Sequence, residues 1–343
     1  MKIQNLQLLV SLVIPSFNNE TRIEFALKSA IAQDYENLEI IFVNDASTDR
    51  TLSIAEEILK NSKRDFKIIN HEKNLGVSAA RNNGIEAACG DFICFCDGDD
   101  MMKINQVSTL LALLQKYNCD ISFGGMIEHF ESGEPDKLVP LNFNVSQPMS
   151  GEQAAYMAIF TKGFTPHLCA MIFRKSFLEK ISLRFTNDVT RGEDSEFSRK
   201  AFCRADKVAF TPECLYIYVY HQNMGTVRDN DITEKRLRNF ESVMGVNIRT
   251  SEYILHYAKS KKIKFFIKNS YLPELAVKRF TACAIFNRPE EYSKLLKDRE
   301  LRKNLWRSFK TFFFKPEVCL KAIAILLMPS FYYKLRRKNK NEN

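Results

Sequence analysis

Three carboxylates directly follow one apolar run in the first third of the chain. The run is Phe92–Cys96, and the acids are Asp97, Asp99 and Asp100, with Gly98 between the first two. Carboxylates at Asp-x-Asp spacing can bind Mg²⁺ or Mn²⁺, which takes one or two protein carboxylates and leaves its other positions to water and phosphate. The other interpretation is a polar turn that caps the next helix, and it suits Asp100 best. The residues alone leave both interpretations open.

Two further polar stretches follow apolar runs upstream. The stretch Ser16–Glu20 follows Leu8–Ile14, and Asp45 follows Leu38–Val43. Asp45 suggests recognition, because a carboxylate can accept a hydrogen bond from the N–H of a planar base. The serine and aspartate further along the same stretch are explained by helix capping alone.

Arg81 lies in the segment NLGVSAARNNG, residues 74–84. The small residues Ser78–Ala80 allow the predicted helix to pack closely, and a guanidinium can donate two parallel hydrogen bonds to a phosphate. Pairing with a nearby acid would explain the same arginine without a ligand.

Glu193 and Asp194 open a predicted helix in the segment RGEDSEF, residues 191–197. A carboxylate here can act as a general base that takes a proton from an acceptor hydroxyl. Stabilisation by the helix dipole is a sufficient structural explanation for both acids. His167 and His221 are the remaining unusual polar residues, and a lone histidine is more often structural than a ligand.

Hydrophobic periodicity predicts alternating strands and helices over the first 120 residues. The predicted strands are residues 8–14, 38–43, 66–69 and 92–96, and the predicted helices are residues 23–31, 51–59, 77–88 and 107–117. This alternation indicates βαβ units and a mainly parallel sheet with helices on both faces. In such sheets ligands bind beyond the carboxyl ends of the strands, so the polar stretches described above are expected at one edge.

Beyond residue 120 the pattern is looser but still predicts both kinds of element. Strands are predicted at residues 120–127, 169–173, 207–210 and 215–220, helices at 150–160 and 195–204, and basic helices from about 233. Thr21–Glu24 and Ser150–Gln153 both match the capping-box pattern, so we expect a side-chain cap at the start of each helix.

The composition is that of a globular protein, with 45% hydrophobic and 27% charged residues in 343. The nine cysteines include no C-x-x-C pair, which favours buried reduced thiols over zinc sites or disulfides. The apolar stretch after Lys2 lacks a signal-peptide cleavage site and is interpreted as the first strand. No window offers the roughly 18 apolar residues of a membrane-spanning helix.

The net charge of +9 is divided unevenly along the chain. Residues 1–255 carry 28 Lys and Arg against 34 Asp and Glu, whereas residues 256–343 carry 22 against 7. The last segment, CLKAIAILLMPSFYYKLRRKNK, joins a short apolar stretch to a basic end. Its composition favours an interfacial helix drawn to anionic lipid. A C-terminal helix that packs on the domain is the alternative.

Five segments, in this order, resemble the family 2 glycosyltransferases, which are inverting nucleotide-sugar enzymes with the GT-A fold. They are VSLVIPSFNNE, QDYENLEIIFVNDASTDRT, NLGVSAARNNGIEAACGDFICFCDGDD, GEDSEF and YVYHQNMGT, and they span about residues 10–227. The resemblance implies an α/β catalytic domain of the GT-A type over residues 1–232. Its nucleotide-binding half ends at about residue 118, and its acceptor half is residues 119–232. Residues 233–343 are then a basic helical C-terminal extension.

The resemblance also implies a role for each motif residue. Asp194 is expected to be the catalytic base, with Glu193 beside it on the acceptor. Asp99 is expected to hold the divalent cation, with Asp97 and His221 as further metal ligands. The residues expected at the donor nucleotide are Pro15, Phe17, Glu20, Asp45, Arg81 and Asp97.

Two positions depart from the pattern of the family. The frequent aromatic-Asn pair after the first proline is here Ser16-Phe17-Asn18, and a frequent arginine is replaced by His221. His221 and Thr226 match a stretch that commonly faces the diphosphate.

The implied reaction is a single in-line displacement at the anomeric carbon of a UDP-sugar, with inversion. Asp194 deprotonates the acceptor hydroxyl, while Mn²⁺ or Mg²⁺ and Arg81 stabilise the leaving nucleoside diphosphate. The expected acceptor is a glycan or a lipid-linked saccharide of surface polysaccharide synthesis. The expected location is cytoplasmic, peripheral on the inner face of the cytoplasmic membrane, reached through the basic tail.

Other classes of function fit parts of the sequence. A nucleic-acid-binding protein would use the basic tail but leaves the acidic strand ends unexplained, so we expect no nucleic acid as partner. A non-catalytic nucleotide-sugar-binding subunit would not need Asp97, Asp99 and Asp194 together. A nucleotidylyltransferase would carry a Gly-rich signature with a basic residue after the first strand, which is not found here. The sequence leaves a homo-oligomer open.

Overall fold

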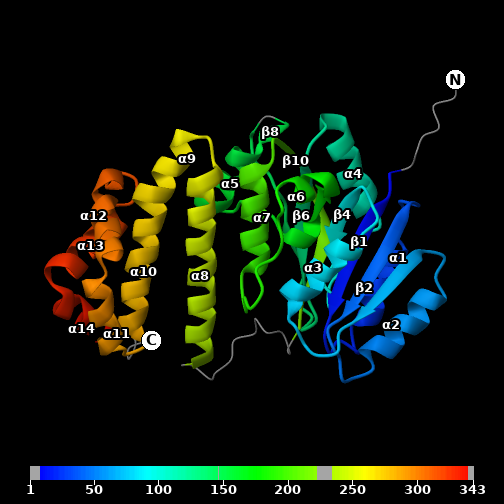
Figure 1. Cartoon of the computed structure of the whole chain (residues 1–343), viewed down its shortest axis with the longest axis horizontal. Coiled ribbons are helices and arrows are strands. Elements are labelled where there is room, and N and C mark those ends of the chain that lie inside the picture. The colour runs from blue at the N-terminus through cyan, green and yellow to red at the C-terminus, as the bar shows by residue number, and fades with distance from the viewer. Residues whose placement is uncertain (1–7, 146, 222–233, 339–343) are drawn as a thin grey trace. The chain divides into compact units, whose positions relative to one another are not determined.

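The computed structural model describes residues 8–145, 147–221 and 234–338, which form two compact units (Figure 1). Unit 1 contains the strands and the helices up to Arg204, and unit 2 contains the helices from Glu234 onward together with Thr190–Gly192. The domain boundary predicted at residue 232 lies outside the described residues.

Unit 1 is built on a single sheet. Its strands are β1 Val10–Ser16, β2 Leu38–Asn44, β3 Asp65–Asn70, β4 Phe92–Phe95, β5 Met101–Met102, β6 Ile121–Phe130, β7 Lys137–Val139, β8 Met149–Ser150, β9 Met171–Arg174 and β10 Lys207–Tyr220. The strand order is β3-β2-β1-β4-β9-β6-β10-β5, with β7 paired to β6 and β8 to β10. β1 to β4 are parallel, and β9 is antiparallel to both β4 and β6. β6 and β10, which are parallel to each other, therefore run in the same direction as β1 to β4.

Helices flank this sheet (Figure 1). They are α1 Ile23–Ile31, α2 Thr51–Lys60, α3 Val77–Ala87, α4 Gln106–Tyr117, α5 Gly151–Phe160, the 3₁₀ turn η1 Leu168–Ala170, α6 Lys175–Lys180 and α7 Glu193–Arg204. Every residue of β1 and β2 is buried, as expected for apolar parallel strands that are covered on both faces. The predicted α/β class with a mainly parallel, helix-flanked sheet is confirmed.

The two capping-box predictions have different outcomes. The Ser150 hydroxyl accepts a hydrogen bond from the Gln153 N–H at 3.2 Å, so this cap is confirmed. The cap predicted at Thr21 is wrong, because α1 begins at Ile23 without a side-chain cap. The Asn19 carbonyl accepts the N–H groups of Arg22 and Ile23 instead.

The two strands predicted at residues 207–210 and 215–220 are one strand, β10. Its pairing with β6 changes register between Phe210 and Cys214 and again between Cys214 and Tyr216. These irregularities explain why the sequence pattern is interrupted there although the strand continues.

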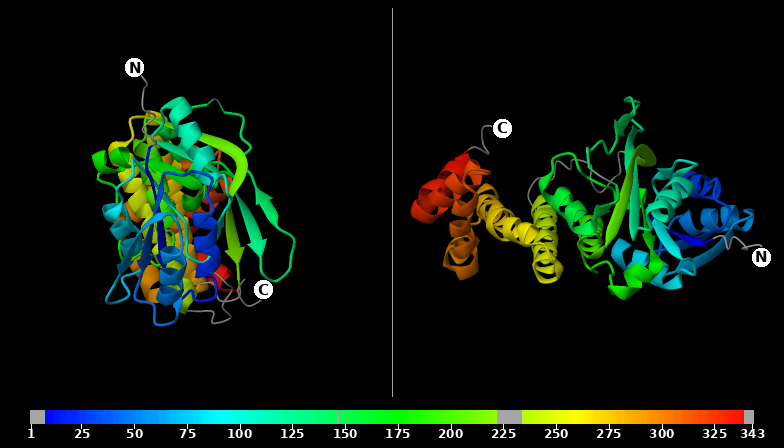
Figure 2. Two further views of the ribbon diagram at one scale, coloured as in Figure 1. Left: turned by 90° about the vertical axis from the view of Figure 1, so that its right-hand side faces the viewer. Right: turned by 90° about the horizontal axis from the view of Figure 1, so that it is seen from above.

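Unit 2 consists of helices. They are α8 Glu234–Tyr257, α9 Lys261–Phe266, the π-helical turn η2 Ile267–Tyr271, α10 Leu272–Ile285, α11 Pro289–Lys297, α12 Arg299–Arg307, the 3₁₀ turn η3 Ser308–Thr311, α13 Pro316–Leu327 and α14 Pro329–Lys338. α10 contacts each of α11 to α14, which gather around it (Figure 2). Phe280, Leu305 and Ile325 are fully buried in the shared core. The predicted helical C-terminal extension is confirmed.

The apolar part of the C-terminal segment is divided between this core and the surface, where Leu320, Leu327, Met328 and Phe331 are exposed. Among the described residues, no single helix is long and apolar enough to cross a bilayer, and α13 and α14 reach that composition only together, across a bend of 118°. Val318, Ala322, Ile325 and Tyr332 are buried in unit 2. Packing on the unit, the alternative left open by the sequence, therefore accounts for these four residues.

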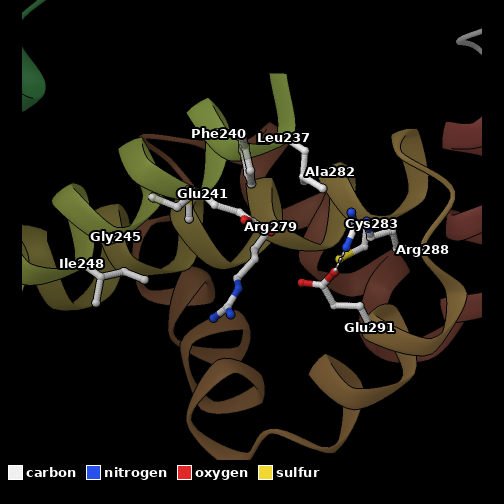
Figure 3. Close-up of a pocket in the computed structure, with 11 residues that line it drawn as sticks. Leu237, Phe240, Glu241, Gly245, Ile248, Arg279, Ala282, Cys283, Arg288 and Glu291 are labelled. Atoms are coloured by element: carbon white, nitrogen blue, oxygen red, sulfur yellow. Dashed lines mark ion pairs between the residues drawn. The ribbon is translucent and has the colours of Figure 1, made fainter. Parts of the chain in front are cut away.

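Unit 2 also contains a cavity of about 290 Å³, partly open to solvent, between α8, α10 and α11 (Figure 3). Phe240, Ile248 and Arg279 line it, and Arg288 and Glu291 form an ion pair of 3.9 Å at its wall. The residues of this cavity include none of those predicted for the functional site.

Candidate active site

The carboxyl ends of β1, β2, β4, β6 and β10 meet at one edge of the sheet because these strands run in the same direction. Asp97–Asp100 follow β4, and His221 directly follows β10. Residues about 120 positions apart along the chain are therefore brought together at this edge. Thr226 lies outside the described residues.

Asp99 and His221 form a pair across the two strand ends. His221 Nε2 and Asp99 Oδ2 are 3.3 Å apart, and the histidine side chain is 7% exposed against 30% for the aspartate. Burial, together with the charge of Asp97, raises the pKa of Asp99. His221 Nδ1 is buried and has no hydrogen-bond partner among the described residues. The pair thus offers one carboxylate and one imidazole to a ligand.

Asp100 has a structural role, and its interpretation as a helix cap is wrong. Its two carboxylate oxygens accept hydrogen bonds of 2.7 Å from the Tyr216 hydroxyl and the Val219 N–H. The next helix, α4, begins only at Gln106. Burial raises the pKa of Asp100 well above its usual range. Asp100 therefore attaches the segment Asp97–Asp100, called the acidic loop below, to β10.

Gly98 is required where the acidic loop crosses the end of β1. A Cβ atom at this position would lie 2.6 Å from Ser16 Oγ and 2.9 Å from Ser16 Cβ. The Gly98 N–H donates to the Pro15 carbonyl at 3.2 Å. Pro15 is thus buried in β1 directly beneath the loop, while Phe17 is 44% exposed just beyond it.

Arg81 connects the acidic loop to α7. Its Nη2 donates to Asp97 Oδ1 at 2.7 Å and its Nη1 to Glu193 Oε1 at 3.0 Å, and the side chain is 3% exposed. The guanidinium also lies over the ring of Phe185, 5.3 Å from the centroid. The pairing with acids that the sequence left open is therefore observed, and the contact of Arg81 with a diphosphate stays a prediction.

The ion pairs with Arg81 leave Asp97 and Glu193 with pKa values shifted in opposite directions. Burial raises the pKa of Asp97, but the Arg81 charge and hydrogen bond outweigh it and bring this pKa below its usual value. Burial also raises the pKa of Glu193, to which Asp194 contributes, and Arg81 offsets only part of this. Asp97 is thus the more firmly ionised partner of the arginine.

Asp194 lies beside Glu193 in the first turn of α7. Its Oδ1 accepts the Ser195 N–H at 2.6 Å, and its Oδ2 has no hydrogen-bond partner among the described residues. The side chain is partly exposed. One carboxylate oxygen is therefore oriented by the backbone while the other is available to accept a proton.

Asp45 and Glu20 are bonded to other parts of unit 1. Asp45 Oδ1 accepts from His71 Nδ1 at 2.7 Å and from the Leu75 N–H at 2.8 Å, and Oδ2 accepts from the Gly76 N–H at 2.8 Å. Glu20 Oε2 pairs with Arg50 Nε at 3.2 Å. Within the described residues no hydrogen bond joins either acid to the Arg81 cluster, which is Arg81 with Asp97 and Glu193. Their contacts with a base or ribose stay predictions.

His167 was interpreted from the sequence as structural, but it lies at the site. Its ring stacks on Tyr216 with centroids 5.1 Å apart, and its buried Nδ1 has no partner in the described part of the chain. Burial lowers the pKa of His167, and the neighbouring charges of Asp194 and Asp97 only partly counteract this. The histidine precedes a 3₁₀ turn in an irregular segment, where no spacing motif could have indicated it.

The three residues expected to bind a divalent cation lie at this edge. No three His, Cys, Asp or Glu side chains gather closely enough to hold a metal ion in the described ranges. Asp97 Oδ1 pairs with Arg81, whereas Asp99 lies beside His221. Binding of a cation by Asp97, Asp99 and His221 stays a prediction.

Comparison with known proteins identifies the family. The model of the family described as Glycosyl transferase family 2 matches residues 11–182. The uncharacterized glycosyltransferase EpsJ of Bacillus subtilis is 30% identical over 295 residues, which are 84% of this chain and 82% of EpsJ. The chain belongs to glycosyltransferase family 2. The enzyme class predicted from the motifs is thereby confirmed.

Other proteins similar to this glycosyltransferase are more distant. The GalNAc(5)-diNAcBac-PP-undecaprenol beta-1,3-glucosyltransferase of Campylobacter jejuni is 25% identical over 274 residues, 74% of this chain and 84% of that protein. Staphylococcus aureus TarS 1–349 in complex with UDP-GlcNAc has a TM-score of 0.68 at 18% identity, covering 97% and 92% of the two chains. The mannosyltransferase PcManGT of Pyrobaculum calidifontis, in complex with GDP-Man and Mn²⁺, has a TM-score of 0.53 at 15% identity, covering 95% and 88%. These two structures share the fold.

Proposed function

We propose that this glycosyltransferase transfers a sugar from a UDP-sugar to a hydroxyl group of a glycan or lipid-linked acceptor in bacterial surface polysaccharide synthesis. The observation that carries the proposal is the position of Arg81, which bonds to Asp97 at the end of β4 and to Glu193 at the start of α7. Because Asp194 follows Glu193, the same guanidinium fixes a candidate base near the acidic loop.

The chemistry proposed for these residues is one displacement. Asp194 Oδ2 takes the proton of the acceptor hydroxyl as the hydroxyl oxygen bonds to the anomeric carbon. The bond between that carbon and the diphosphate oxygen breaks on the opposite side, so the configuration inverts. Glu193, held by Arg81, orients the acceptor beside the base.

A UDP-sugar donor is supported by the fold shared with TarS, which was solved with UDP-GlcNAc. In this proposal residues up to about 118 hold the nucleotide, with Pro15, Phe17, Glu20 and Asp45 near the base and ribose. Residues 119–232 then hold the acceptor. A lipid-linked acceptor is supported by the undecaprenol-linked substrate in the name of the C. jejuni relative, and it would be met at the inner face of the cytoplasmic membrane.

We further propose that Asp99 and His221 bind Mn²⁺ or Mg²⁺. When bound, such an ion neutralises negative charge on the departing diphosphate. The proposal is supported by the carboxylate–imidazole pair of 3.3 Å and by the Mn²⁺ present in the PcManGT structure.

A panel of UDP-sugars, with GDP-mannose as the contrasting donor, tests the proposal. Binding and slow hydrolysis are measured for the full chain with and without Mn²⁺, and for Asp99→Asn and Asp194→Asn. We expect one or more UDP-sugars to bind only with Mn²⁺ and an intact Asp99, and Asp194→Asn to bind the donor without turning it over. Donor binding that ignores both the metal and Asp99 would contradict the metal assignment. Unchanged turnover in Asp194→Asn would refute the catalytic base.

A further inference from the structure

Large apolar side chains that are exposed are concentrated in one part of unit 2. Ten of the nineteen found in the described residues lie between Trp306 and Leu335, and Phe313 and Phe314 are 95% and 71% exposed. Contiguous exposed apolar surface on a protein commonly marks a site of interaction with another protein or a membrane.

Two segments far apart in the sequence form part of this surface. The Thr311 hydroxyl donates to the Asn269 carbonyl at 2.9 Å, which joins η3 to η2. The rings of Phe266 and Phe314 lie 5.9 Å apart, edge to face. The basic segment 259–268 and the aromatic segment 306–314 are therefore neighbours in space.

We define the aromatic-basic patch by nine of the exposed side chains of residues 259–268 and 302–314. They are Phe265, Lys268, Arg302, Trp306, Phe309, Lys310, Phe312, Phe313 and Phe314.

The aromatic residues of the patch point away from the core of unit 2. Leu305, Ser308 and Thr311 are buried at intervals of three residues, whereas Trp306 and Phe309 are exposed at the next positions. Trp306 and Phe309 stack on each other with centroids 5.3 Å apart. The helical turn therefore has one face in the core and an aromatic face outside it.

The patch has a single sign of charge. Residues 259–268 and 302–315 together carry ten Lys and Arg and no Asp or Glu. Two of these ten, Lys303 and Lys315, form ion pairs with Glu300 and Glu274 outside the two ranges. Two copies of such a surface would bring like charges together, which disfavours self-association. Basic residues beside exposed Trp and Phe are the composition of a surface that binds at the interface of an anionic membrane.

We propose that the aromatic-basic patch docks this protein on an anionic phospholipid bilayer, with the aromatic rings at the level of the acyl boundary and the basic groups at the headgroups. The docking surface thus lies on α9, η2, α12, η3 and residues 312–314. α13 and α14 expose further apolar side chains, such as Leu327 and Phe331. The inference deepens the proposed use of a lipid-linked acceptor. Its test needs no catalysis, so failure of either proposal can be recognised separately.

Trp306 makes the test direct because it is the one tryptophan of the chain. Its fluorescence is followed while the full-length protein is titrated with protein-free vesicles of phosphatidylglycerol and phosphatidylcholine, or of phosphatidylcholine alone. We expect a blue shift, and quenching by lipids brominated on the acyl chain, with the anionic vesicles and not with the neutral ones.

Paired variants separate the two components of the patch. Phe313→Ser with Phe314→Ser is expected to weaken binding at least about tenfold, because two apolar groups no longer enter the interface. Lys268→Gln with Lys310→Gln is expected to weaken it roughly 25-fold at low salt, about fivefold for each basic residue. Phe25→Ser is the matched control, because Phe25 is 59% exposed but belongs to α1 in unit 1.

Three results would overturn the proposal. They are the absence of a shift with anionic vesicles, an equal shift with neutral vesicles, and a shift that depends on protein concentration without lipid. The last would assign the patch to a second copy of the chain. All four changed side chains are exposed, so unchanged circular dichroism is the criterion for accepting each variant.

Discussion

At the scale of single residues, Arg81 has the largest influence on the site. A buried arginine with two carboxylate partners is desolvated at considerable cost, which the two ion pairs of 2.7 Å and 3.0 Å offset. Removing Arg81 leaves both carboxylates without their charged partner. The geometry of Asp97 and Glu193 therefore depends on one side chain that belongs to neither of their elements.

Replacement of Arg81 by methionine is expected to lower the free energy of unfolding by about 3 kcal/mol, because two partly buried acids lose their partner. Urea denaturation measures this. Adding Asp97→Asn to Arg81→Met should recover part of the loss, since one of the unpaired charges is gone. Arg22→Met is the control, because its partner Glu131 is 40% exposed and the loss should be about 1 kcal/mol or less. Equal losses in the two single variants would contradict the special role of Arg81.

Replacement of Asp194 by asparagine is expected to lower kcat by about 10²–10⁴-fold, because the amide cannot accept the acceptor proton. Donor affinity should stay unchanged, since the asparagine Oδ1 can still accept the Ser195 N–H and Arg81 pairs with Asp97 and Glu193 rather than with Asp194. Steady-state kinetics with calorimetric donor binding separates the two quantities. Asp206→Asn, beyond the other end of α7, is the control and should behave as the natural enzyme.

At the scale of elements, a second buried acid joins strands near the amino end of β2. Glu39 in β2 is 6% exposed and accepts hydrogen bonds of 2.6 Å from the Ser11 hydroxyl and the Cys89 N–H. Lys67 Nζ lies 3.4 Å from its Oε2. Burial raises the pKa of Glu39, but these partners outweigh it and hold the pKa below its usual value. β1, β2 and the start of β4 are thus joined by one carboxylate.

Replacement of Glu39 by glutamine is expected to cost about 1–3 kcal/mol at neutral pH, since a buried charged acceptor is lost. Because the folded pKa is depressed, this contribution is complete above the unfolded pKa of about 4.3 and is lost as pH falls through the folded value. The difference in stability between the two proteins should therefore shrink below about pH 4.3. Urea titrations at several pH values check this, and a difference that grows on acidification would refute it.

Local patterns predicted the regular elements well and the bonds between them poorly. Strands and helices could be predicted from hydrophobic periodicity, because the burial of one or both faces of an element determines the spacing of apolar residues within a short stretch of sequence. Thr21 and Ser150 show the limit, since the same four-residue pattern forms a cap only at Ser150. The partners of Asp100 and Arg81 could not be predicted, because they lie up to 119 residues away and are set by strand order.

At the scale of the whole molecule, the C-terminal segment is part of the structure of unit 2. Val318, Ala322, Ile325 and Tyr332 share a core with Phe280. Loss of one such aliphatic side chain costs about 2–5 kcal/mol, against a total stability of about 5–15 kcal/mol for a domain. A deletion of residues 318–343 therefore removes more stability than the unit has.

We expect this deletion to unfold unit 2, and a truncation after Lys338 to leave it folded. Helical circular dichroism and limited proteolysis of the two proteins provide the comparison. Loss of membrane binding in the longer deletion would then report unfolding, so the exposed-patch variants are the appropriate probes of docking. A deletion protein that keeps its helical signal and protease resistance would contradict the assignment of these residues to the core.

The late position of β10 in the chain has a consequence for the order in which the enzyme becomes competent during synthesis. β1 to β4 are complete by residue 95, so this half of the sheet can form while the rest is still being translated. The acidic loop that follows obtains the partners of Asp100 and Asp99 only when residues 216–221 leave the ribosome. A nascent chain shorter than this lacks the β10 partners of Asp99 and Asp100, although Asp97 already has Arg81. The catalytic edge therefore cannot be complete before residue 221 has been synthesised.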